Sequence, residues 1–373
     1  MEEFKRYWIA FNLVKGIGAV RTRVLLDYFG DLETAWQAPA TELEAAGLGT
    51  KTLKTLLEVR RSDLLEKTCN YIDTRRIVVL TWQDEDYPRR LSEVDLPPPV
   101  LYMLGEISGE DEWAVAIVGT RRFTAYGRQA TEEISEVLAG SGITIVSGLA
   151  RGIDAIAHRA ALKAGGRTIA VLGSGLDQIY PPEHHQLAQE IASQGALLSD
   201  YPPGTAPESI NFPPRNRIIS GLSRAVVVVE AGEKSGALIT AAFAAEQGRE
   251  VFAVPGSIYA PQCKGTNLLI QQGANALLNA KDLLSALSLN QLSAQRQVRA
   301  VLPADAVEAQ LYSLLARETM HIDEIHAQMN LPIEKISATL TLMELKGLIR
   351  QVGSMSYIAI HEAQADYHLG GEE

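Results

Sequence analysis

The segment at residues 211–222 combines side chains suited to binding phosphate groups. Arg215 and Arg217 stand on either side of Asn216, and Phe212 and two prolines precede them. A guanidinium group is a planar fork of hydrogen-bond donors that matches a phosphate group. Phe212 and the prolines stiffen the chain that leads to the two arginines. The segment therefore predicts contact with a phosphorylated ligand.

Small and basic residues also follow the other apolar runs of the central region. In an open α/β sheet, the loops at the carboxyl ends of the strands meet where the strand order reverses, and ligands bind there. Glycine lets the backbone approach a ligand closely. The candidate binding residues in these loops are Gly119, Thr120, Arg121, Arg122, Gly148, Arg151, Gly152, Ser235, Gly236 and Lys264. Together with segment 211–222, they predict a pocket for a polyanion.

The strands that must position these loops are short apolar runs without alternation. We place them at 115–118, 144–146, 168–172, 196–198, 225–229 and 251–254, with helices at 126–138, 153–163 and 237–247. Runs buried on both faces and joined by helical crossovers indicate an α/β fold with a doubly wound, Rossmann-like parallel sheet. We expect this binding domain to span residues 114–287.

The region before the sheet indicates a helical domain at residues 1–65 and a connector with short strands at 66–113. The sequence Lys15-Gly16-Ile17-Gly18 precedes an apolar helical pattern, and a second half-copy runs from Leu43 to Leu57. This pattern is typical of a helix-hairpin-helix or SAM-like domain, in which helix N-termini can meet a phosphate. A helical packing or dimerisation domain is the alternative.

The region after the sheet predicts a polar linker at 288–303, a winged helix-turn-helix domain at 304–360 and a disordered tail at 361–373. In the third helix of the winged domain, at 333–346, Lys335 and Lys346 are opposed by Glu334 and Glu344. A helix that reads DNA usually presents Arg, Lys, Asn or Gln to the groove. We therefore expect this domain to bind a partner more than to read DNA.

Composition limits the function classes further. The chain has 34 Lys+Arg against 45 Asp+Glu, a net charge of −11, so a binding surface must be a local basic one. No apolar run has the length needed to span a membrane. The two cysteines, Cys69 and Cys263, support neither a disulfide framework nor a metal site, and we expect a reduced, cytoplasmic compartment.

Catalysis is not indicated, and no cofactor is expected. The loops lack the dinucleotide fingerprint and the Walker A lysine motif. Ser147 and Ser235 lie in suitable loops, but no base and orienting group accompany them, and His158 fits a packed helix position. Glu230 ends a strand and could act as a base, or it could pair with an arginine. The alternative function is therefore a nucleotide-processing hydrolase that uses Glu230.

Three segments together resemble the DNA processing protein A (DprA) family, also called Smf. They are 117–121 (IVGTR), 146–154 (VSGLARGID) followed by Ala157-His158, and 215–219 (RNRII), and the likeness extends over about 85–280. The resemblance implies a protein that binds single-stranded DNA through a Rossmann-like domain and acts as a dimer. It also implies help in loading the RecA recombinase on DNA during natural transformation.

The resemblance adds expectations for single positions. Arg121 matches the arginine that follows Gly-Ser/Thr in the family. Some relatives carry a basic residue just after Tyr-Pro, where this chain has Pro182. The resemblance therefore implies that this phosphate contact is either missing or replaced, with Lys264 as the candidate replacement. Phe212 or Tyr201 is expected to stack on a base.

Overall fold

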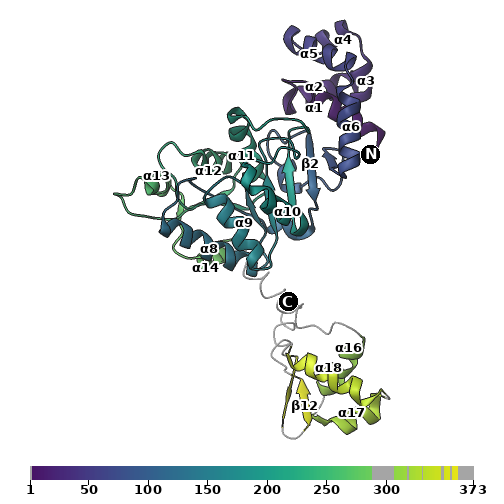
Figure 1. The fold of residues 1–373 in the computed structure, drawn as a ribbon, viewed down its shortest axis with the longest axis vertical. Coiled ribbons are helices and arrows are strands. Elements are labelled where there is room, and N and C mark those ends of the chain that lie inside the picture. The colour runs from purple at the N-terminus through teal and green to yellow at the C-terminus, as the bar shows by residue number, and fades with distance from the viewer. Residues whose placement is uncertain are drawn as a thin grey trace, which may run out of the picture. The chain divides into compact units, whose positions relative to one another are not determined.

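The structure is a computed structural model, and it divides the chain into two compact units (Figure 1). It describes residues 2–287, 306–316, 319–329, 331–345, 348–352 and 355–359. Unit 1 comprises Met1–Leu289 and unit 2 comprises Asn290–Glu373. The predicted linker at 288–303 and the predicted tail at 361–373 fall outside the described residues.

Unit 1 is built on one large sheet. Its strands are β1 (Val78–Thr81), β2 (Val100–Gly105), β3 (Val115–Val118), β4 (Ile145–Ser147), β5 (Thr168–Val171), β6 (Ala196–Ser199), β7 (Ala225–Val228), β8 (Glu250–Ala253) and β9 (Asn275–Ala276). Their order is β1-β2-β6-β5-β4-β3-β7-β8-β9. The pairs from β6 to β9 are parallel, and β2 pairs with both β1 and β6 in antiparallel fashion. The predicted doubly wound, Rossmann-like sheet is confirmed.

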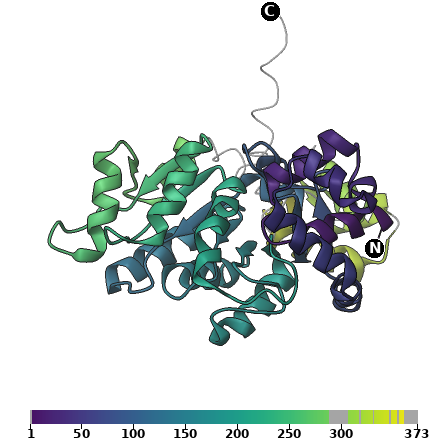
Figure 2. The same cartoon turned by 90° about the horizontal axis from the view of Figure 1, so that it is seen from above.

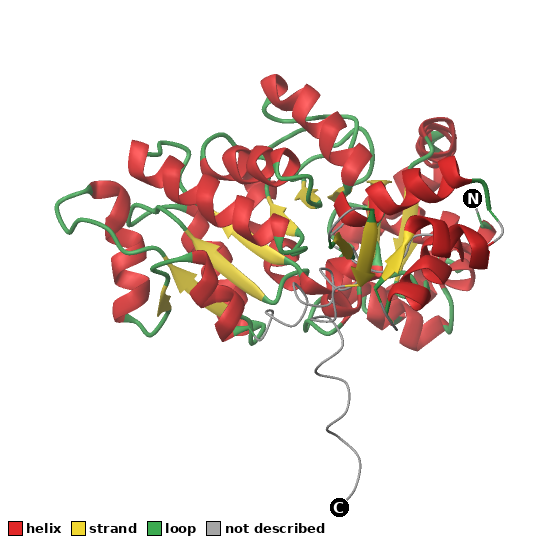
Figure 3. Ribbon diagram, turned by 90° about the horizontal axis from the view of Figure 1, so that it is seen from below, coloured by secondary structure: helices red, strands yellow, loops and turns green. Residues whose placement is uncertain are grey.

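Helices cover both faces of this sheet (Figure 3). Those of the sheet region are α7 (Arg89–Ser92), α8 (Ala125–Gly140), α9 (Ile153–Lys163), α10 (His185–Gln194), α11 (Phe212–Gly221), α12 (Gly236–Glu246), α13 (Lys264–Gln271) and α14 (Ala280–Ala286). Residues of β5 alternate between two hydrophobic clusters: Ala170 packs with residues of α9 and α10, whereas Ile169 and Val171 pack with residues of α11 and α12. This alternation explains why the strand sequence is apolar on both faces.

The N-terminal helices lie at one end of the sheet and α13 lies at the other (Figure 2). They are α1 (Glu3–Asn12), α2 (Ala19–Phe29), α3 (Leu32–Gln37), α4 (Ala40–Ala45), α5 (Thr50–Arg61) and α6 (Leu64–Arg75). The turns at Gly16 (φ 100°) and Gly47 (φ 94°) precede α2 and α5 and need the left-handed backbone that glycine adopts readily.

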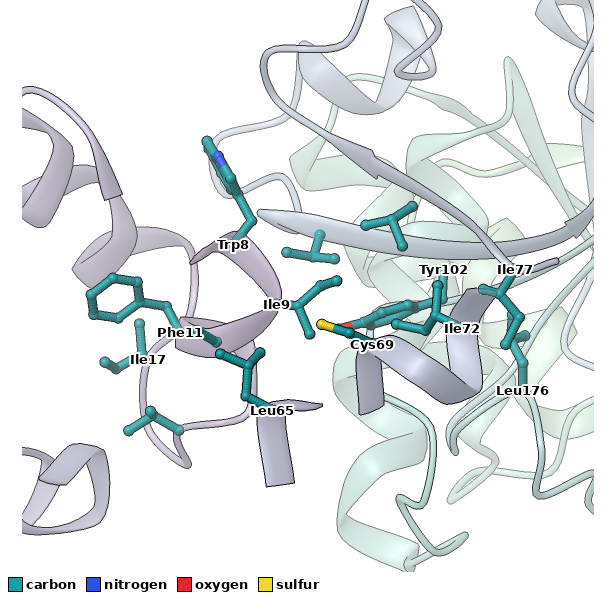
Figure 4. Packing of buried hydrophobic residues seen from close by; sticks show 14 of the residues in the cluster. Trp8, Ile9, Phe11, Ile17, Leu65, Cys69, Ile72, Ile77, Tyr102 and Leu176 are labelled. Carbon is teal, nitrogen blue, oxygen red and sulfur yellow. The ribbon is translucent and has the colours of Figure 1, made fainter. Parts of the chain in front are cut away.

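These helices share a hydrophobic core with the antiparallel end of the sheet (Figure 4). Trp8, Ile9 and Phe11 of α1 belong to the same buried cluster as Ile72 of α6 and Tyr102 of β2. The two short strands predicted in the connector are β1 and β2, so residues 78–105 extend the sheet. Helices and sheet in unit 1 are therefore packed on one another.

Unit 2 is small and has its own core. Its elements are α16 (Ala306–Leu315), β10 (Met320–His321), α17 (Ile322–Met329), α18 (Ile333–Leu345), β11 (Ile349–Gln351) and β12 (Ser356–Ala359). The strands form a sheet in the order β10-β12-β11. Leu311, Ile325, Ile336, Leu340 and Met343 are fully buried in its centre. This order of helices and wing strands is the predicted winged helix.

Candidate nucleic-acid interface

A cleft of about 680 Å³ opens at the carboxyl edge of the sheet in unit 1. The chain continues from β3 to β4 on one side and returns to β7 on the other side of β3, so the strand order reverses between β3 and β7. The cleft lies at this switch point, where the fold class places ligands. Its lining includes Gly119, Thr120, Arg121, Arg122, Asp154, Tyr180, Phe212, Arg215, Asn216, Lys234, Ser235 and Gly236.

The loop after β3 carries the first two arginines, and Glu230 holds both ends of it. The backbone N–H of Thr120 donates to the Glu230 carbonyl at 2.7 Å. The N–H and hydroxyl of Thr124 donate to the Glu230 carboxylate at 2.9 and 2.5 Å. Thr124 is in turn the N-cap of α8. Glu230 is fully buried, whereas Arg121 and Arg122 between the two anchors are exposed.

The approach of Glu230 to α8 requires a residue without a side chain. A Cβ atom at Gly127 would lie 2.2 Å from the Glu230 carboxylate oxygen Oε2. Alanine at this position would therefore displace the carboxylate that holds the arginine loop.

The loop after β4 is held by a buried pair of opposite charges. The carboxylate of Asp154 accepts hydrogen bonds from the N–H groups of Gly148 and Ala150 at 3.2 and 3.4 Å. Arg215 Nη1 donates to the carbonyls of Gly148 and Val171. Arg215 is only 4% exposed. The predicted phosphate ligand Arg215 is therefore largely committed to bracing this loop.

Burial controls the protonation of both groups. It raises the pKa of Asp154, against the opposing effect of the Arg215 charge and the two amides. It lowers the pKa of Arg215 to about 10, so this guanidinium stays charged at neutral pH. Arg215 Nε, which is buried, has no hydrogen-bond partner among the residues that the structure describes. A buried donor of this kind next to the cleft is one that an anionic ligand can satisfy.

Phe212 lies at the start of α11 among cations and a second ring. The guanidinium carbons of Arg121 and Arg215 lie 5.9 and 5.8 Å from the centre of its ring. The Tyr180 ring lies 5.8 Å away, centre to centre, at 42°. Arg151 and Tyr180 also line a small depression that joins Arg121 and Phe212. This arrangement offers charge for a phosphate next to ring faces for a base.

The opposite wall of the cleft comes from α11 and the loop after β7. Asn216 Nδ2 donates to the Gly236 carbonyl at 3.2 Å. Ser235 caps α12 by accepting a hydrogen bond from the N–H of Ala237 at 3.3 Å. Lys234 is exposed beside it and also lines the cleft.

The structure does not bring every candidate residue to the cleft. Arg217 pairs with Asp200 at 3.7 Å and donates to the Leu96 carbonyl at 3.0 Å. Lys264 pairs with Glu233 at 3.5 Å, and neither Arg217 nor Lys264 lines the cleft.

Two other candidates, Gly152 and Tyr201, have supporting contacts. Gly152, with a φ of 87°, packs against the Thr120 carbonyl, and a Cβ atom there would lie 2.3 Å from that oxygen. The Tyr201 hydroxyl donates to the Asn211 carbonyl at 3.2 Å and braces the approach to α11. Segment 215–217, expected in a loop, lies within α11.

Cations around the cleft differ in their ion pairs. Arg151 Nε and Nη2 donate to the Glu183 carboxylate at 2.5 and 3.0 Å. Among the residues that the structure describes, Arg121, Arg122 and Lys234 form no ion pair. These three exposed charges are free to meet an anion.

Three of the groups considered for hydrolysis, Ser147, His158 and Glu230, are buried and bonded to the scaffold. The Ser147 hydroxyl donates to the Ile117 carbonyl at 2.6 Å. His158 is fully buried, its Nδ1 lies 2.7 Å from the Thr168 hydroxyl, and burial lowers its pKa to about 3. Glu230 bonds to Thr124 instead of pairing with an arginine. Within the described ranges, no group of His, Cys, Asp or Glu residues is placed to hold a metal ion.

No helix in the described part of the chain is both long and apolar enough to cross a membrane.

Fold and site together define a Rossmann-like protein with a cationic, aromatic-lined cleft at the switch point of its sheet. Residues 78–288 match the family described as DNA recombination-mediator protein A, and residues 295–354 match the DprA winged helix domain. The chain belongs to this DprA/Smf family.

Individual relatives support this assignment. The chain is 41% identical to protein Smf of Synechocystis sp., over 94% of this chain and 98% of the relative. It is 36% identical to protein Smf of Escherichia coli, over 87% and 88% of the two chains. DNA processing protein DprA of Bacillus subtilis is 49% identical, over 54% and 69%.

Two solved structures share the fold. DprA from Streptococcus pneumoniae has a TM-score of 0.66 at 35% identity and covers 75% of this chain and 97% of its own. DprA from Helicobacter pylori, described with a single-stranded DNA binding mode, has a TM-score of 0.52 at 33% identity, with coverage of 58% and 98%.

Proposed function

We propose that this protein binds single-stranded DNA in the cleft between β3 and β7. The observation that carries the proposal is the position of Arg121 beside Phe212, with Arg122 and Lys234 exposed on the same cleft. Single-strand binders combine basic grooves for the backbone with aromatic rings on which bases stack. The single-strand binding described for the H. pylori relative supports the same ligand.

We infer that the protein is a binder and not a hydrolase. The carboxylate of Glu230, the candidate base of the alternative function, is buried and accepts two hydrogen bonds from Thr124. A general base must reach the proton that it removes, and this carboxylate faces the start of α8. Its contacts favour a role in holding the arginine loop.

We also propose that the protein forms a homodimer and helps to load RecA on incoming DNA during natural transformation, which would place it in the cytoplasm. β9 is the last strand at its edge of the sheet, and Leu268 and Leu278 near it are 41% and 76% exposed. An open sheet edge beside exposed apolar residues favours association with another chain. Leu278→Lys should lower the molar mass measured by light scattering if this edge forms the dimer.

Unit 2 is proposed to bind a protein partner. On α18, the exposed residues include Lys335 and Glu344, whose charges cancel, and Leu342, which is 53% exposed. Such a face attracts phosphates weakly. Truncation after Pro303 should leave single-strand affinity nearly unchanged, and a large loss would instead assign DNA binding to unit 2.

The test of the function is a length series of oligonucleotides measured at two salt concentrations. A cleft that follows a strand should need several nucleotides, and its affinity should fall steeply with salt. Nucleoside monophosphates should bind weakly and be recovered intact. Tight binding and turnover of one mononucleotide would support the hydrolase instead.

A further inference from the structure

The loop between β8 and α13, residues 255–263, carries unusually exposed large side chains. Tyr259 is 88% exposed and Ile258 is 71% exposed. Figure 1 shows this outer loop projecting from the body of unit 1 beside α13. Leaving a tyrosine ring in water forgoes the stabilisation that burial of its apolar surface would give. Such exposure indicates a surface that meets a ligand.

The outer loop borders the cleft wall that carries Lys234. The N–H of Gly265 donates to the Ala231 carbonyl at 2.8 Å, and Lys264 pairs with Glu233 at 3.5 Å. These contacts join the beginning of α13 to the loop after β7. The outer loop is therefore continuous with the rim of the cleft.

The loop also contacts the first turn of α8 through Tyr126. This residue lies in the first turn of α8, just after the loop that carries Arg122, and its hydroxyl donates to the Pro255 carbonyl at 2.8 Å. Its ring is 49% exposed, and the neighbouring Phe123 is 40% exposed. Phe123 and Tyr126, which follow Arg122 in the sequence, thus add two exposed rings near the outer loop.

We propose that the outer loop forms a second stacking platform, which takes bases of the same DNA strand where the strand leaves the cleft. Tyr259 would stack on a base, and Arg122 and Lys264 would lie near the phosphates that lead to it. A single strand is the occupant that this chemistry fits, because every base offers a face for stacking and the flanking charges are cationic. The inference rests on the proposed single-strand binding.

Two oligothymidylates, one of about 4 and one of about 20 nucleotides, separate the platform from the cleft. In Tyr259→Ala, the longer strand should bind at least about fivefold more weakly, since a base–aromatic stack contributes about 1 kcal/mol or more. Affinity for the shorter strand should not change. The salt dependence should also be unchanged, because a stacked ring neutralises no phosphate.

Controls distinguish stacking from other roles. Tyr259→Phe keeps the ring and should bind the longer strand as the unchanged protein does. Tyr28→Ala removes a tyrosine that is 53% exposed on α2 and should leave both affinities unchanged.

Three outcomes would overturn the inference. If Tyr259→Ala binds the longer strand as tightly as the unchanged protein does, the outer loop is not a stacking platform. A changed molar mass in Tyr259→Ala identifies the loop as a contact between copies of the chain. If neither strand binds the unchanged protein, the proposed function fails, and the platform fails with it.

Discussion

The guanidinium carbon of Arg121 lies 5.9 Å from the centre of the Phe212 ring, which joins the loop after β3 to the first turn of α11. The two residues are far apart in sequence, and the reversal of strand order brings them to one cleft. A nucleotide in this cleft can place its phosphate on the cation and its base on the ring. The pair therefore links the charged and apolar parts of the binding chemistry.

Phe212→Ala should weaken single-strand binding by about 1–3 kcal/mol, because the base loses its stacking face. Phe212→Trp should retain most of the affinity. The dependence of affinity on salt should be the same in both variants, since no charge is removed. Fluorescence anisotropy with a labelled oligonucleotide measures both quantities. Full affinity in Phe212→Ala would show that the ring only packs against Tyr180.

Glu183→Gln should tighten single-strand binding, by up to about fivefold. The Glu183 carboxylate accepts two hydrogen bonds from the Arg151 guanidinium. A phosphate that binds Arg151 must therefore displace this carboxylate. Both side chains are about half exposed, at 54% and 51%, so water screens the pair and it adds little to stability. Glu136→Gln is the matched control, because it breaks the pair with Lys163 toward the opposite end of α8. Weaker binding in Glu183→Gln would mean that the pair holds Arg151 in its binding position.

Glu230→Gln should lower the free energy of unfolding by about 1–3 kcal/mol, because a buried amide replaces an acceptor of two hydrogen bonds. Single-strand affinity should fall with it, since the loop of Arg121 and Arg122 loses an anchor. Chemical denaturation and binding measured on the same preparation test this. Nucleotide turnover in the unchanged protein that disappears in Glu230→Gln would instead establish the hydrolase.

The strands and the switch-point cleft could be predicted from the sequence because short apolar runs and their loops are local signals. The predicted runs at 115–118 and 196–198 coincide with β3 and β6 to within a residue. The hydrogen-bond and ion-pair partners of individual cations could not be predicted from these local signals. Arg215 and Arg217 have the same chemistry, yet one braces the loop after β4 and the other pairs with Asp200. Only the packing of α11 decides which carbonyls and carboxylates each of them reaches.

The strand pairing at the antiparallel end of the sheet could not be predicted from the sequence either. The runs that form β1 and β2 are short, and nothing in them specifies β6 as a partner. Their place follows from the core that Tyr102 shares with Ile9 and Ile72. Such a long-range contact leaves no periodic pattern in the sequence.

His158 should make the protein less stable in mild acid. Burial lowers the pKa of His158 from 6.5 to about 3. The imidazole is therefore protonated below about pH 6.5 in the unfolded chain, but only below about pH 3 in the folded chain. The free energy of unfolding therefore falls as the pH drops through this window, by about 2 kcal/mol from this group at pH 5 relative to pH 7. Urea unfolding of His158→Asn at both pH values should show a correspondingly smaller loss. An equal pH dependence in the two proteins would show that the imidazole is accessible to protons.

The most direct test of the central claim is the salt dependence of single-strand affinity in Arg121→Ala. If about four phosphates are neutralised, the logarithm of affinity should fall with the logarithm of salt concentration with a slope of about −2.8, at about 0.7 per contact. Arg121→Ala should flatten this slope by about 0.7 and weaken all sequences alike, with an unchanged Tm, because backbone contacts carry no base information. Lys163→Ala removes one charge at the C-terminal end of α9, away from the cleft. It should change neither the slope nor the affinity. An unchanged slope with normal affinity in Arg121→Ala and Arg151→Ala would contradict the account.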